Sequence, residues 1–573
     1  VVTLRLPGPL ETAPSARVVT RAEIEDRGHV DAFDALTELP GVHLSRNGGF
    51  GGATTLRLRG ATSDKALVLV DGVPVNDASA PAGGYDFSTL DLFDVDRIEV
   101  LSGPQGSLWG SDAIGGVVNV VTRPAEGARA FVEAGAYETL RGGLAVGRRD
   151  EAGALGLTLS GLTTEGISKA DARDGNTERD GFDLFTAALR GERRLTDRVK
   201  VEGGLRYADS RVEYDGFSFA SPTGVADGPE ASEQTSWSAF AGVGFEAAGF
   251  EQALRLDGYR LERADFGPYP FAAEADRLAL RWTATRTVQG VGEVLVGLER
   301  EETSADTGEG HETSDANAAF AIWRARPAPG LTTTLSLRVD DPDRYEGETT
   351  ARAAFVWQAG GGVWLAGAAG QGFKTPSIFQ STWPCGFCSP AGPARGLKPE
   401  RAQGYELTLG WRGARAEGSV TAYRLEVEDQ IDFGFPGGYA NLDRTRSDGI
   451  EAEGRVTLAP GLTARAAYAW TDAIDRTTGA RLLKVPEHSG SAGIDWRGER
   501  ARASLSVRAK GERADVYGRT DGYVVADLAG GWRLTDRVEV TLRVENLTDE
   551  AYQEALGYGE PGRSAYAGLK LGW

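Results

Sequence analysis

From about residue 128 to the end of the chain, short runs of alternating apolar and polar residues follow one another, separated by Gly, Pro, Asp and Asn. In the last run Ala567, Leu569 and Leu571 alternate with small or polar residues, and residues 538–544 repeat the pattern. A period of two is typical of a strand with one apolar and one polar face. In a soluble sandwich the apolar faces of two sheets would pack together, whereas in a membrane barrel they would face lipid and the polar faces would line a wet lumen.

The connections between these runs favour the barrel. Short turns recur in pairs of identical sequence, Leu-Thr-Asp-Arg at 195–198 and 534–537 and Pro-Gly-Leu-Thr at 329–332 and 460–463. Other connections, such as 168–181 and 215–236, are long and rich in Asp, Gly and Ser. Short turns at one end and long loops at the other are typical of outer-membrane barrels.

The length of this region sets the size of the barrel. Residues 128–573 leave roughly 20 residues for each of 22 strands with its connection, and about 10 are enough to cross a bilayer. Trp573 follows an alternating strand, where an interfacial aromatic would lie. We therefore expect a transmembrane antiparallel β-barrel of about 22 strands over residues 128–573. A lumen that wide needs a plug.

Composition excludes several other classes of protein. The longest apolar stretch, 353–370, carries Gln358 and five glycines, which disfavour a membrane-spanning helix. The formal net charge of −21 argues against a nucleic-acid partner. The 78 glycines are nearly double the usual share of about 7% and suit many tight turns. The chain has no Met and opens at Val1, so we expect that a secretory signal peptide has been removed.

Residues 1–127 predict a small α+β domain that would serve as the plug. A helix is expected over 22–39, with Thr20 and Glu23 forming a capping box at its start and Pro40-Gly41 ending it. A strand pair is expected at 55–59 and 66–70, and further strands at 97–101 and 116–122. The continuous apolar run at 68–70 implies burial on both faces rather than contact with lipid.

Several motifs in both regions resemble those of TonB-dependent outer-membrane transporters. Residues 67–76 (LVLVDGVPVN) and 96–120 (DRIEVLSGPQGSLWGSDAIGGVVNV) look like the plug of that family. The barrel half adds GFKTPS at 372–377, LKPER at 397–401, Tyr405-Glu406 and VENLTDEAY at 544–552. The resemblance covers essentially the whole chain. It implies a location in the outer membrane of a Gram-negative bacterium, in contact with lipid and lipopolysaccharide.

The resemblance also implies energised import. A periplasmic TonB protein would pull on an N-terminal Ton box, using the proton gradient of the inner membrane. Val1, Val2 and Thr3 match the tail of the Ton box pattern, and we expect them to bind TonB as an added strand. A passive pore has no use for a folded plug and an adhesin has none for a Ton box, so both alternatives are disfavoured.

Within the family the chain resembles the cobalamin transporters. The similarity lies in Gly41-Val42, in RNGG at 46–49, in GSDAIGG at 110–116, in the compact barrel and in the ending at 557–563. It implies import of cobalamin or a related corrinoid. The alternative is a metal chelate, an iron-siderophore, whereas haem import is disfavoured because the chain has only four histidines. A surface-exposed accessory lipoprotein is a further partner to consider.

By position, the plug loops at 46–52 and 76–86 would form the extracellular apex and bind substrate. The candidate residues are Arg46, Asn47, Gly48, Gly49, Phe50, Asn76 and Tyr85. Glycine permits close approach of the backbone to a bulky ligand. The alternative is that these glycines only make turns.

One arginine is expected to hold the plug in the barrel. The family usually carries an arginine before Gly-Pro in the plug, where this chain has Ser102, but Arg59 before Gly60 is retained. We expect Arg59 to pair with Glu400 or Glu406 of the barrel wall. The plug would then be held to the barrel by one positive charge fewer than is usual in the family. The alternative is a solvated surface arginine.

Two neighbouring loops concentrate carboxylates that suit calcium. The first holds Asp171, Asp174, Glu178 and Asp180, and the second holds Asp215 and Asp227. Ca²⁺ takes about 6–8 oxygen ligands, and the resemblance implies calcium in these two hairpin loops. The alternative is a pair of solvated charge runs. No organic cofactor is expected.

The only cysteines, Cys385 and Cys388, lie in a Pro- and Gly-rich segment. We expect a disulfide that pins a long exposed loop, the alternative being a redox CxxC, which would need a thioredoxin-like helix. The four histidines fall in dissimilar contexts, and the glycine clusters do not lie in a βαβ unit. The chain is therefore not expected to be an enzyme.

Overall fold

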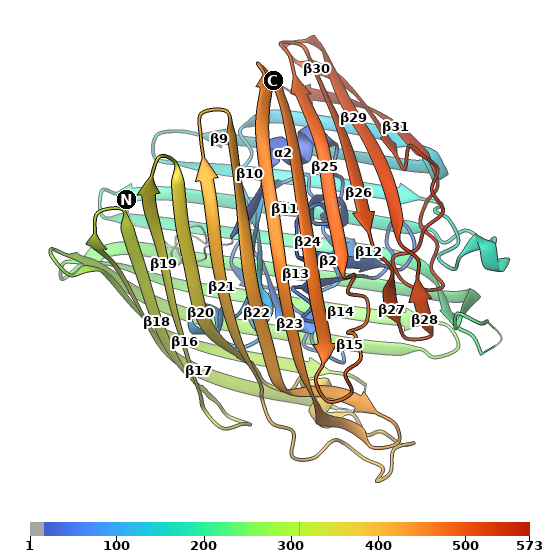
Figure 1. Cartoon of the computed structure of the whole chain (residues 1–573), viewed down its shortest axis with the longest axis horizontal. Coiled ribbons are helices and arrows are strands. Elements are labelled where there is room, and N and C mark those ends of the chain that lie inside the picture. The colour runs from blue at the N-terminus through green and yellow to red at the C-terminus, as the bar shows by residue number, and fades with distance from the viewer. Residues whose placement is uncertain (1–15, 220, 309, 573) are drawn as a thin grey trace.

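The computed structural model describes residues 16–219, 221–308 and 310–572. Twenty-two antiparallel strands form a closed barrel, and the last strand pairs with the first to close it (Figure 1). This confirms the fold predicted from the alternating pattern. The strands are β8 (Gly127–Gly135), β9 (Thr139–Arg149), β10 (Gly153–Thr164), β11 (Phe182–Thr196), β12 (Val199–Phe217), β13 (Val225–Ala247), β14 (Phe250–Phe266), β15 (Phe271–Val288), β16 (Gly292–Asp306), β17 (His311–Ala328), β18 (Leu331–Pro342), β19 (Glu348–Gly360), β20 (Val363–Lys374), β21 (Glu400–Arg412), β22 (Ala416–Gly434), β23 (Gly438–Ala459), β24 (Leu462–Asp475), β25 (His488–Arg497), β26 (Ala501–Lys510), β29 (Tyr523–Thr535), β30 (Val538–Glu545) and β31 (Ser564–Gly572).

The two ends of the barrel differ as the turn sequences predict. The four repeated turn segments join β11 to β12, β17 to β18, β23 to β24 and β29 to β30. At the other end the connections are longer, at 165–181, 375–399, 476–487, 511–522 and 546–563, and this is the extracellular end of such a barrel. The connection at 511–522 contains a small hairpin, β27 (Arg513–Asp515) and β28 (Gly518–Thr520).

One predicted loop is wrong. Residues 215–236 belong mostly to β12 and β13, which have 19 and 23 residues and are joined by 218–224. About 10 residues cross a bilayer, so these strands rise well above the membrane. There the outer face of the sheet meets water instead of lipid, which explains a loop-like composition in paired strands.

The outer surface carries the apolar residues. In β18, Leu335, Leu337 and Val339 are 45%, 50% and 48% exposed, whereas Ser336 and Arg338 between them are buried. This arrangement is typical of strands with lipid outside and a polar lumen inside. Exposed tryptophans lie a few residues from the short turns, as in an interfacial girdle, namely Trp323, Trp357, Trp411, Trp496 and Trp532.

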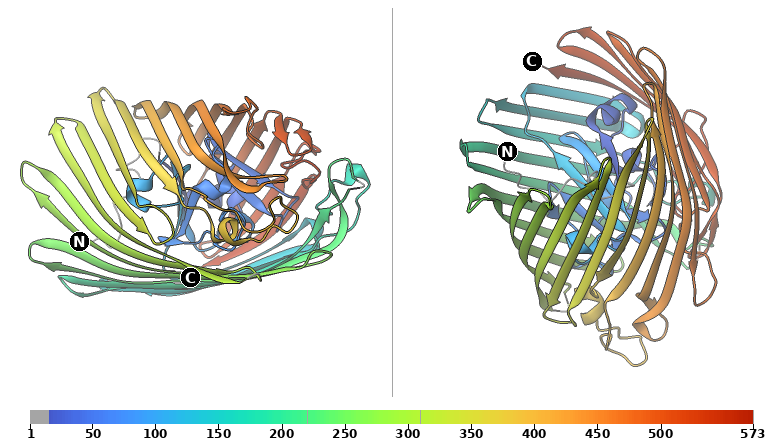
Figure 2. Two further views of the ribbon diagram at one scale, coloured as in Figure 1. Left: turned by 90° about the horizontal axis from the view of Figure 1, so that it is seen from below. Right: turned by 60° about the vertical axis from the view of Figure 1, so that its left-hand side comes forward.

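The plug fills the lumen, as Figure 2 shows for the blue segment inside the ring of strands. Its five-stranded sheet has the order β1-β6-β7-β4-β5, and β2 and β3 form a separate hairpin. The last plug strand ends at Thr122 and the first barrel strand begins at Gly127. The plug strands are β1 (Arg17–Thr20), β2 (Val42–Arg46), β3 (Thr54–Leu58), β4 (Ala66–Val70), β5 (Val73–Pro74), β6 (Val95–Ser102) and β7 (Gly116–Thr122). The helical elements of the plug are α2 (Arg21–Arg27), α3 (Ala32–Leu36), η1 (Ser63–Lys65), η2 (Phe87–Thr89) and α4 (Gly106–Trp109).

The expected long plug helix is two helices, although its start is as predicted. The capping box of Thr20 and Glu23 is present at the start of α2. Gly28 then ends α2 in a left-handed conformation, with φ of 68°, and the side chain of Asp31 caps α3. In the part of the chain with a described structure, no helix is long and apolar enough to cross a membrane.

The expected pairing of strands 55–59 and 66–70 is also wrong. β3 pairs with β2, and β4 pairs in parallel with β7 and antiparallel with β5. The chain turns away between β3 and β4 at Arg59, whose φ is 51°, and at Gly60. All of β4 is buried, as its continuous apolar run predicts. The plug core extends to the barrel wall, where Phe240 and Leu261 pack against it.

Candidate functional site

The first apical loop of the plug, 47–53, packs closely against the barrel loops. A Cβ on Gly48 would lie 2.8 Å from the backbone of Lys169, and one on Gly51 would lie 2.4 Å from the Phe182 ring. The ammonium of Lys169 donates a hydrogen bond to the Phe50 carbonyl at 2.5 Å. These glycines therefore serve close packing of the plug against the barrel. A Cβ on Gly49, by contrast, would make only ordinary contacts, 3.5 Å from Pro561 and 3.7 Å from Ile167.

Arg46 at the end of β2 is held by carboxylates. Its guanidinium donates to Glu560 at 2.5 and 3.1 Å, lies 3.6 Å from Asp31 and stacks over the Phe33 ring at 4.1 Å. Burial alone would lower the pKa of Arg46, but Glu560 and Asp31 raise it. The side chain thus joins the plug to the barrel loop 546–563.

The second apical loop, 76–86, is organised from within the plug. Asn76 is buried, accepts from the Val68 amide at 2.8 Å and donates to the carbonyls of Ala66 and Gly83 at 3.0 and 3.1 Å. Tyr85 packs edge-on against Phe87 at 5.0 Å, and burial raises the pKa of Tyr85 to about 12. Among the seven predicted substrate residues, surface remains accessible on Asn47, Phe50 and Tyr85, whereas the other four are buried.

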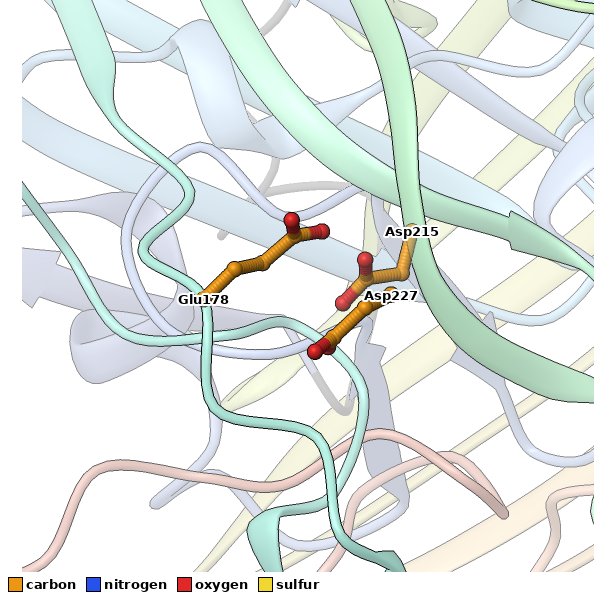
Figure 3. Close-up of side chains that lie close together, drawn as sticks. All are labelled: Glu178, Asp215 and Asp227. Atoms are coloured by element: carbon orange, nitrogen blue, oxygen red, sulfur yellow. The ribbon is translucent and has the colours of Figure 1, made fainter.

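The structure brings together part of the predicted calcium set. Carboxylate oxygens of Glu178, Asp215 and Asp227 lie within 4.8 Å of one another (Figure 3). Ser168 Oγ donates to Asp215 and Asp227 at 3.2 and 3.0 Å. None of the three carboxylates forms an ion pair with Lys or Arg among residues 16–219, 221–308 and 310–572. We call Glu178, Asp215 and Asp227 the acidic cluster.

Asp180 adjoins the acidic cluster, but Asp171 and Asp174 do not. Asp180 accepts from the Lys169 amide at 2.6 Å, and burial together with the nearby Asp215 raises the pKa of Asp180 to about 7. Asp171 pairs with Arg173 at 2.6 Å and accepts from Gln553 at 2.5 Å. Asp174 is exposed at the end of the 3₁₀ turn η4 (Ala172–Asp174).

Arg59 is buried between two carboxylates of the barrel wall. Its Nη1 lies 2.9 Å from Glu406 and its Nε 3.0 Å from Glu451, and its guanidinium stacks over Tyr423 at 4.4 Å. The predicted pair with Glu406 is thus present, and the solvated alternative is wrong. Glu400 does not pair with Arg59, but it joins the barrel to the plug through Lys65 at 3.1 Å.

Sequence reasoning missed Glu451, which also accepts from Arg17 at 2.8 Å. The sequence feature that could have indicated it is a pair of carboxylates, Glu451 and Glu453, two residues apart in an alternating strand. It also missed the loop 546–563, in which the fully buried Glu554 accepts from Lys510 at 2.9 Å and pairs with Arg513 at 3.3 Å. This loop joins the plug apex to the barrel, because Ser45 Oγ donates to the Glu554 carbonyl at 3.0 Å.

The disulfide Cys385–Cys388 is formed. It follows the short helix α5 (Ile378–Thr382), which lies over the plug because Ser377 Oγ donates to the Pro81 carbonyl at 2.9 Å. Aromatic rings surround this loop in mutual contact, an arrangement that sequence reasoning did not predict. They are Phe379, Trp383, Phe387, Phe433 and Tyr439.

Comparisons with known proteins agree over nearly the whole chain. A family model described as "TonB dependent receptor-like, beta-barrel" matches residues 133–547, and one described as "TonB-dependent Receptor Plug Domain" matches 9–117. The Vitamin B12 transporter BtuB of Vibrio vulnificus is 27% identical over 567 residues, which are 95% of this chain and 89% of the relative. The protein of the same name from Photobacterium profundum is 27% identical over 573 residues, 96% of this chain and 91% of the relative.

Solved structures share the fold at lower identity. A mutant of the ferric enterobactin receptor PfeA of Pseudomonas aeruginosa has a TM-score of 0.84 and 18% identity, with 98% of this chain and 99% of that one covered. The siderophore receptor PirA of Acinetobacter baumannii has a TM-score of 0.83 and 17% identity, with 98% of each chain covered.

Proposed function

The chain belongs to the TonB-dependent receptor family, and from this premise we propose that its substrate is cobalamin or a related corrinoid. Members of the family are transporters or receptors of the Gram-negative outer membrane that work with TonB, and they are not enzymes. The proposal concerns the substrate alone.

The observation that carries the proposal is the end-to-end similarity to proteins named as vitamin B12 transporters. They match 95% and 96% of this chain, plug and barrel together. The siderophore receptors of similar structure are under 25% identical and support the fold. Import of an iron-siderophore is therefore the alternative that an experiment must separate.

Calcium in the acidic cluster is part of the proposal. Three carboxylates that share a small volume without a bound lysine or arginine repel one another, and a divalent cation relieves that repulsion. The ligands are oxygens only, which suits Ca²⁺ rather than a softer metal. Asp180 would join them once deprotonated. A bound ion would fasten the loop 165–181, whose Lys169 contacts the plug, to the ends of β12 and β13.

Three further expectations stay proposals. Val1, Val2 and Thr3, the segment proposed to bind TonB, lie outside the described residues. The apolar outer face and its tryptophans suit contact with lipid and lipopolysaccharide. An accessory surface lipoprotein stays a prediction.

Calorimetry on the detergent-purified protein tests the substrate and the ion together. We expect cyanocobalamin to bind, and to bind more tightly with calcium than with a chelator. Ferric catecholate and hydroxamate siderophores are the comparison ligands. Tight binding of a siderophore, with no binding of cyanocobalamin in either condition, would overturn the corrinoid proposal. Absence of a calcium isotherm would overturn the calcium proposal alone.

A further inference from the structure

The outer face of the β2–β3 hairpin meets two extracellular loops at a group of basic side chains. His43 and Arg57 are direct cross-strand partners, so their side chains share the face opposite the plug core. Lys484 comes from the loop 476–487, and its amide donates to the Ala514 carbonyl at 2.7 Å, beside Arg513 of the loop 511–522. We call His43, Arg57, Lys484 and Arg513 the basic cluster.

The basic cluster has more positive than negative charge. Arg513 shares Glu554 with Lys510, at 3.3 and 2.9 Å. No carboxylate of residues 16–219, 221–308 or 310–572 lies within ion-pair distance of Arg57 or Lys484. Asp515 is near both, but it already accepts hydrogen bonds from the amides of Val516 and Leu556. In a chain with a net charge of −21, this is a local excess of cations.

Several nitrogens of the cluster lack a hydrogen-bond partner although they are buried. They are Nδ1 and Nε2 of His43, Nε of Arg57 and Nη1 of Arg513. His43 and Arg513 are only 2% and 4% exposed. Buried polar atoms nearly always have a partner. The guanidinium nitrogens and one nitrogen of a neutral His43 ring are donors, so the cluster is short of hydrogen-bond acceptors.

The electrostatics point in the same direction. Burial lowers the pKa of Arg57, and burial together with the charges of Arg57 and Arg513 lowers the pKa of Lys484. Burial and the nearby Lys510 lower the pKa of His43 to about 3, so its ring is neutral at neutral pH. An anion bound at the accessible parts of Arg57 and Lys484 would relieve this repulsion and accept charge-assisted hydrogen bonds from them.

Part of the cluster is accessible to a ligand. Arg57 and Lys484 are half-buried, whereas His43 and Arg513 are buried. From this geometry we propose that the basic cluster is a binding site for an oxyanion of the transported ligand, with Arg57 and Lys484 as the residues that contact it. Resting on the corrinoid proposal, the inference names the phosphodiester of cobalamin as that oxyanion.

Cobalamin and cobinamide provide the test, because cobinamide has the corrin ring but no phosphodiester. Calorimetry would compare both ligands on the wild type, on Arg57→Gln, on Lys484→Gln and on the double variant. A charge-assisted hydrogen bond is worth about 1.5–3 kcal/mol, so each single variant should weaken cobalamin binding about ten- to hundredfold. Binding of cobinamide should stay within about twofold of the wild type.

Arg519→Gln is the matched control, since Arg519 lies in the β27–β28 hairpin with Arg513 of the cluster, and its side chain is 65% exposed beside Glu512. We expect no change for either ligand with this variant. Cobalamin binding by the double variant at wild-type affinity would overturn the inference. An equal loss for both ligands would also overturn it, because the side chains would then act on the plug and not on the phosphodiester.

A wild type that binds neither corrinoid would refute the proposed substrate instead. The oxyanion site is then tested with inorganic phosphate, by the shift in the thermal unfolding midpoint against chloride at equal ionic strength. A shift in the wild type that the double variant lacks would support the site for another anionic ligand. The same shift in both proteins, or none in the wild type, would overturn it.

Discussion

Arg59 joins the plug to the barrel wall through a buried group of ion pairs. Its removal leaves Glu406 and Glu451 buried, with Arg17 still beside Glu451. Breaking a buried ion pair from one side costs about 3–5 kcal/mol. We expect Arg59→Ala to lower the free energy of plug unfolding by about 3 kcal/mol, the low end of that range because Arg17 remains. Urea titration, followed by protease protection of the plug, measures the change.

Arg455→Ala is the control for this prediction. Arg455 pairs with Glu417 on the barrel, but its side chain is 62% exposed, and exposed pairs contribute about 0–1 kcal/mol. Similar losses in the two variants would contradict a special role for Arg59.

A sequence motif can identify one member of a buried network but rarely all of them. Arg59 and Glu406 lie in recognisable motifs, and their pairing was predictable. Glu451 lies in β23, 392 positions from Arg59 in the sequence, and only closure of the barrel brings it opposite the plug. In the acidic loop, likewise, the path of the chain turns Glu178 toward Asp215 and directs Asp171 to Arg173. Composition does not encode that path.

The raised pKa of Asp180 predicts a pH dependence for calcium. Its pKa in the fold is about 7, above the ordinary value of 3.8, so the ion-free fold favours the protonated form. Its contribution to stability is present below the ordinary pKa and is lost as pH rises toward about 7. Calcium requires the carboxylate. We therefore expect calcium affinity to rise between about pH 5 and about pH 8, as measured by calorimetry.

Two substitutions in the same loop decide whether Asp180 is responsible. Asp180→Asn should reduce this pH dependence, whereas Asp174→Asn should leave it unchanged, because Asp174 is exposed and apart from the acidic cluster. A flat calcium affinity in the wild type over this range would contradict the assignment.

At the scale of elements, the errors have local physical causes. The helix expected over 22–39 divides because Gly28 adopts φ of 68° and Asp31 caps a new helix, whereas the helical spacing continues through both. Residues 215–236 have the composition of a loop but pair as strands. Polar composition indicates contact with water, and above the membrane the outer face of a strand meets water instead of lipid. Backbone pairing with neighbouring strands then decides the structure.

The apical loop 47–53 depends on a glycine at its contact with the barrel. Gly48 has φ of 76°, and a Cβ there would lie 2.8 Å from the Lys169 backbone. A left-handed conformation costs an L-residue about 1–2 kcal/mol, and the overpacked contact costs about 1–3 kcal/mol more. We expect Gly48→Ala to separate this loop from 165–181. Faster amide hydrogen exchange in both segments would report it.

Substitution of Gly479 separates the conformational cost from the cost of the overpacked contact. It has φ of 74°, close to that of Gly48, but a Cβ there would meet nothing within 4 Å. Gly479→Ala should therefore show only the conformational cost, with exchange confined to its own loop. Equal effects of the two substitutions on 165–181 would mean that the contact with Lys169 is unimportant.

At the scale of the whole molecule, the barrel reverses the usual arrangement of a soluble protein, with polar residues inside and apolar residues outside. Charged residues such as Arg338 and Asp340 pair inside the lumen at 2.8 Å, while leucines cover the outside. Period-two alternation with polar connections was enough to predict the barrel, because lipid and lumen impose opposite requirements on alternate residues. The length of the region suited 22 strands, the different pattern of residues 1–127 indicated the plug, and the family motifs implied the outer membrane. The same alternation leaves the choice of substrate undetermined, since that choice depends on loops whose contacts span the whole barrel.

Substitution of a lipid-facing leucine tests this arrangement. Leu337 is 50% exposed near the middle of β18, and an arginine at the bilayer midplane costs about 2–4 kcal/mol. We expect Leu337→Arg to lower the stability of the barrel by that amount in urea titrations of folding into lipid vesicles. Leu483→Arg is the matched control, since Leu483 is 43% exposed but lies in the loop 476–487, where water already surrounds it. If both arginines cost the same, exposure alone would govern these positions and the outer face of β18 would not meet lipid.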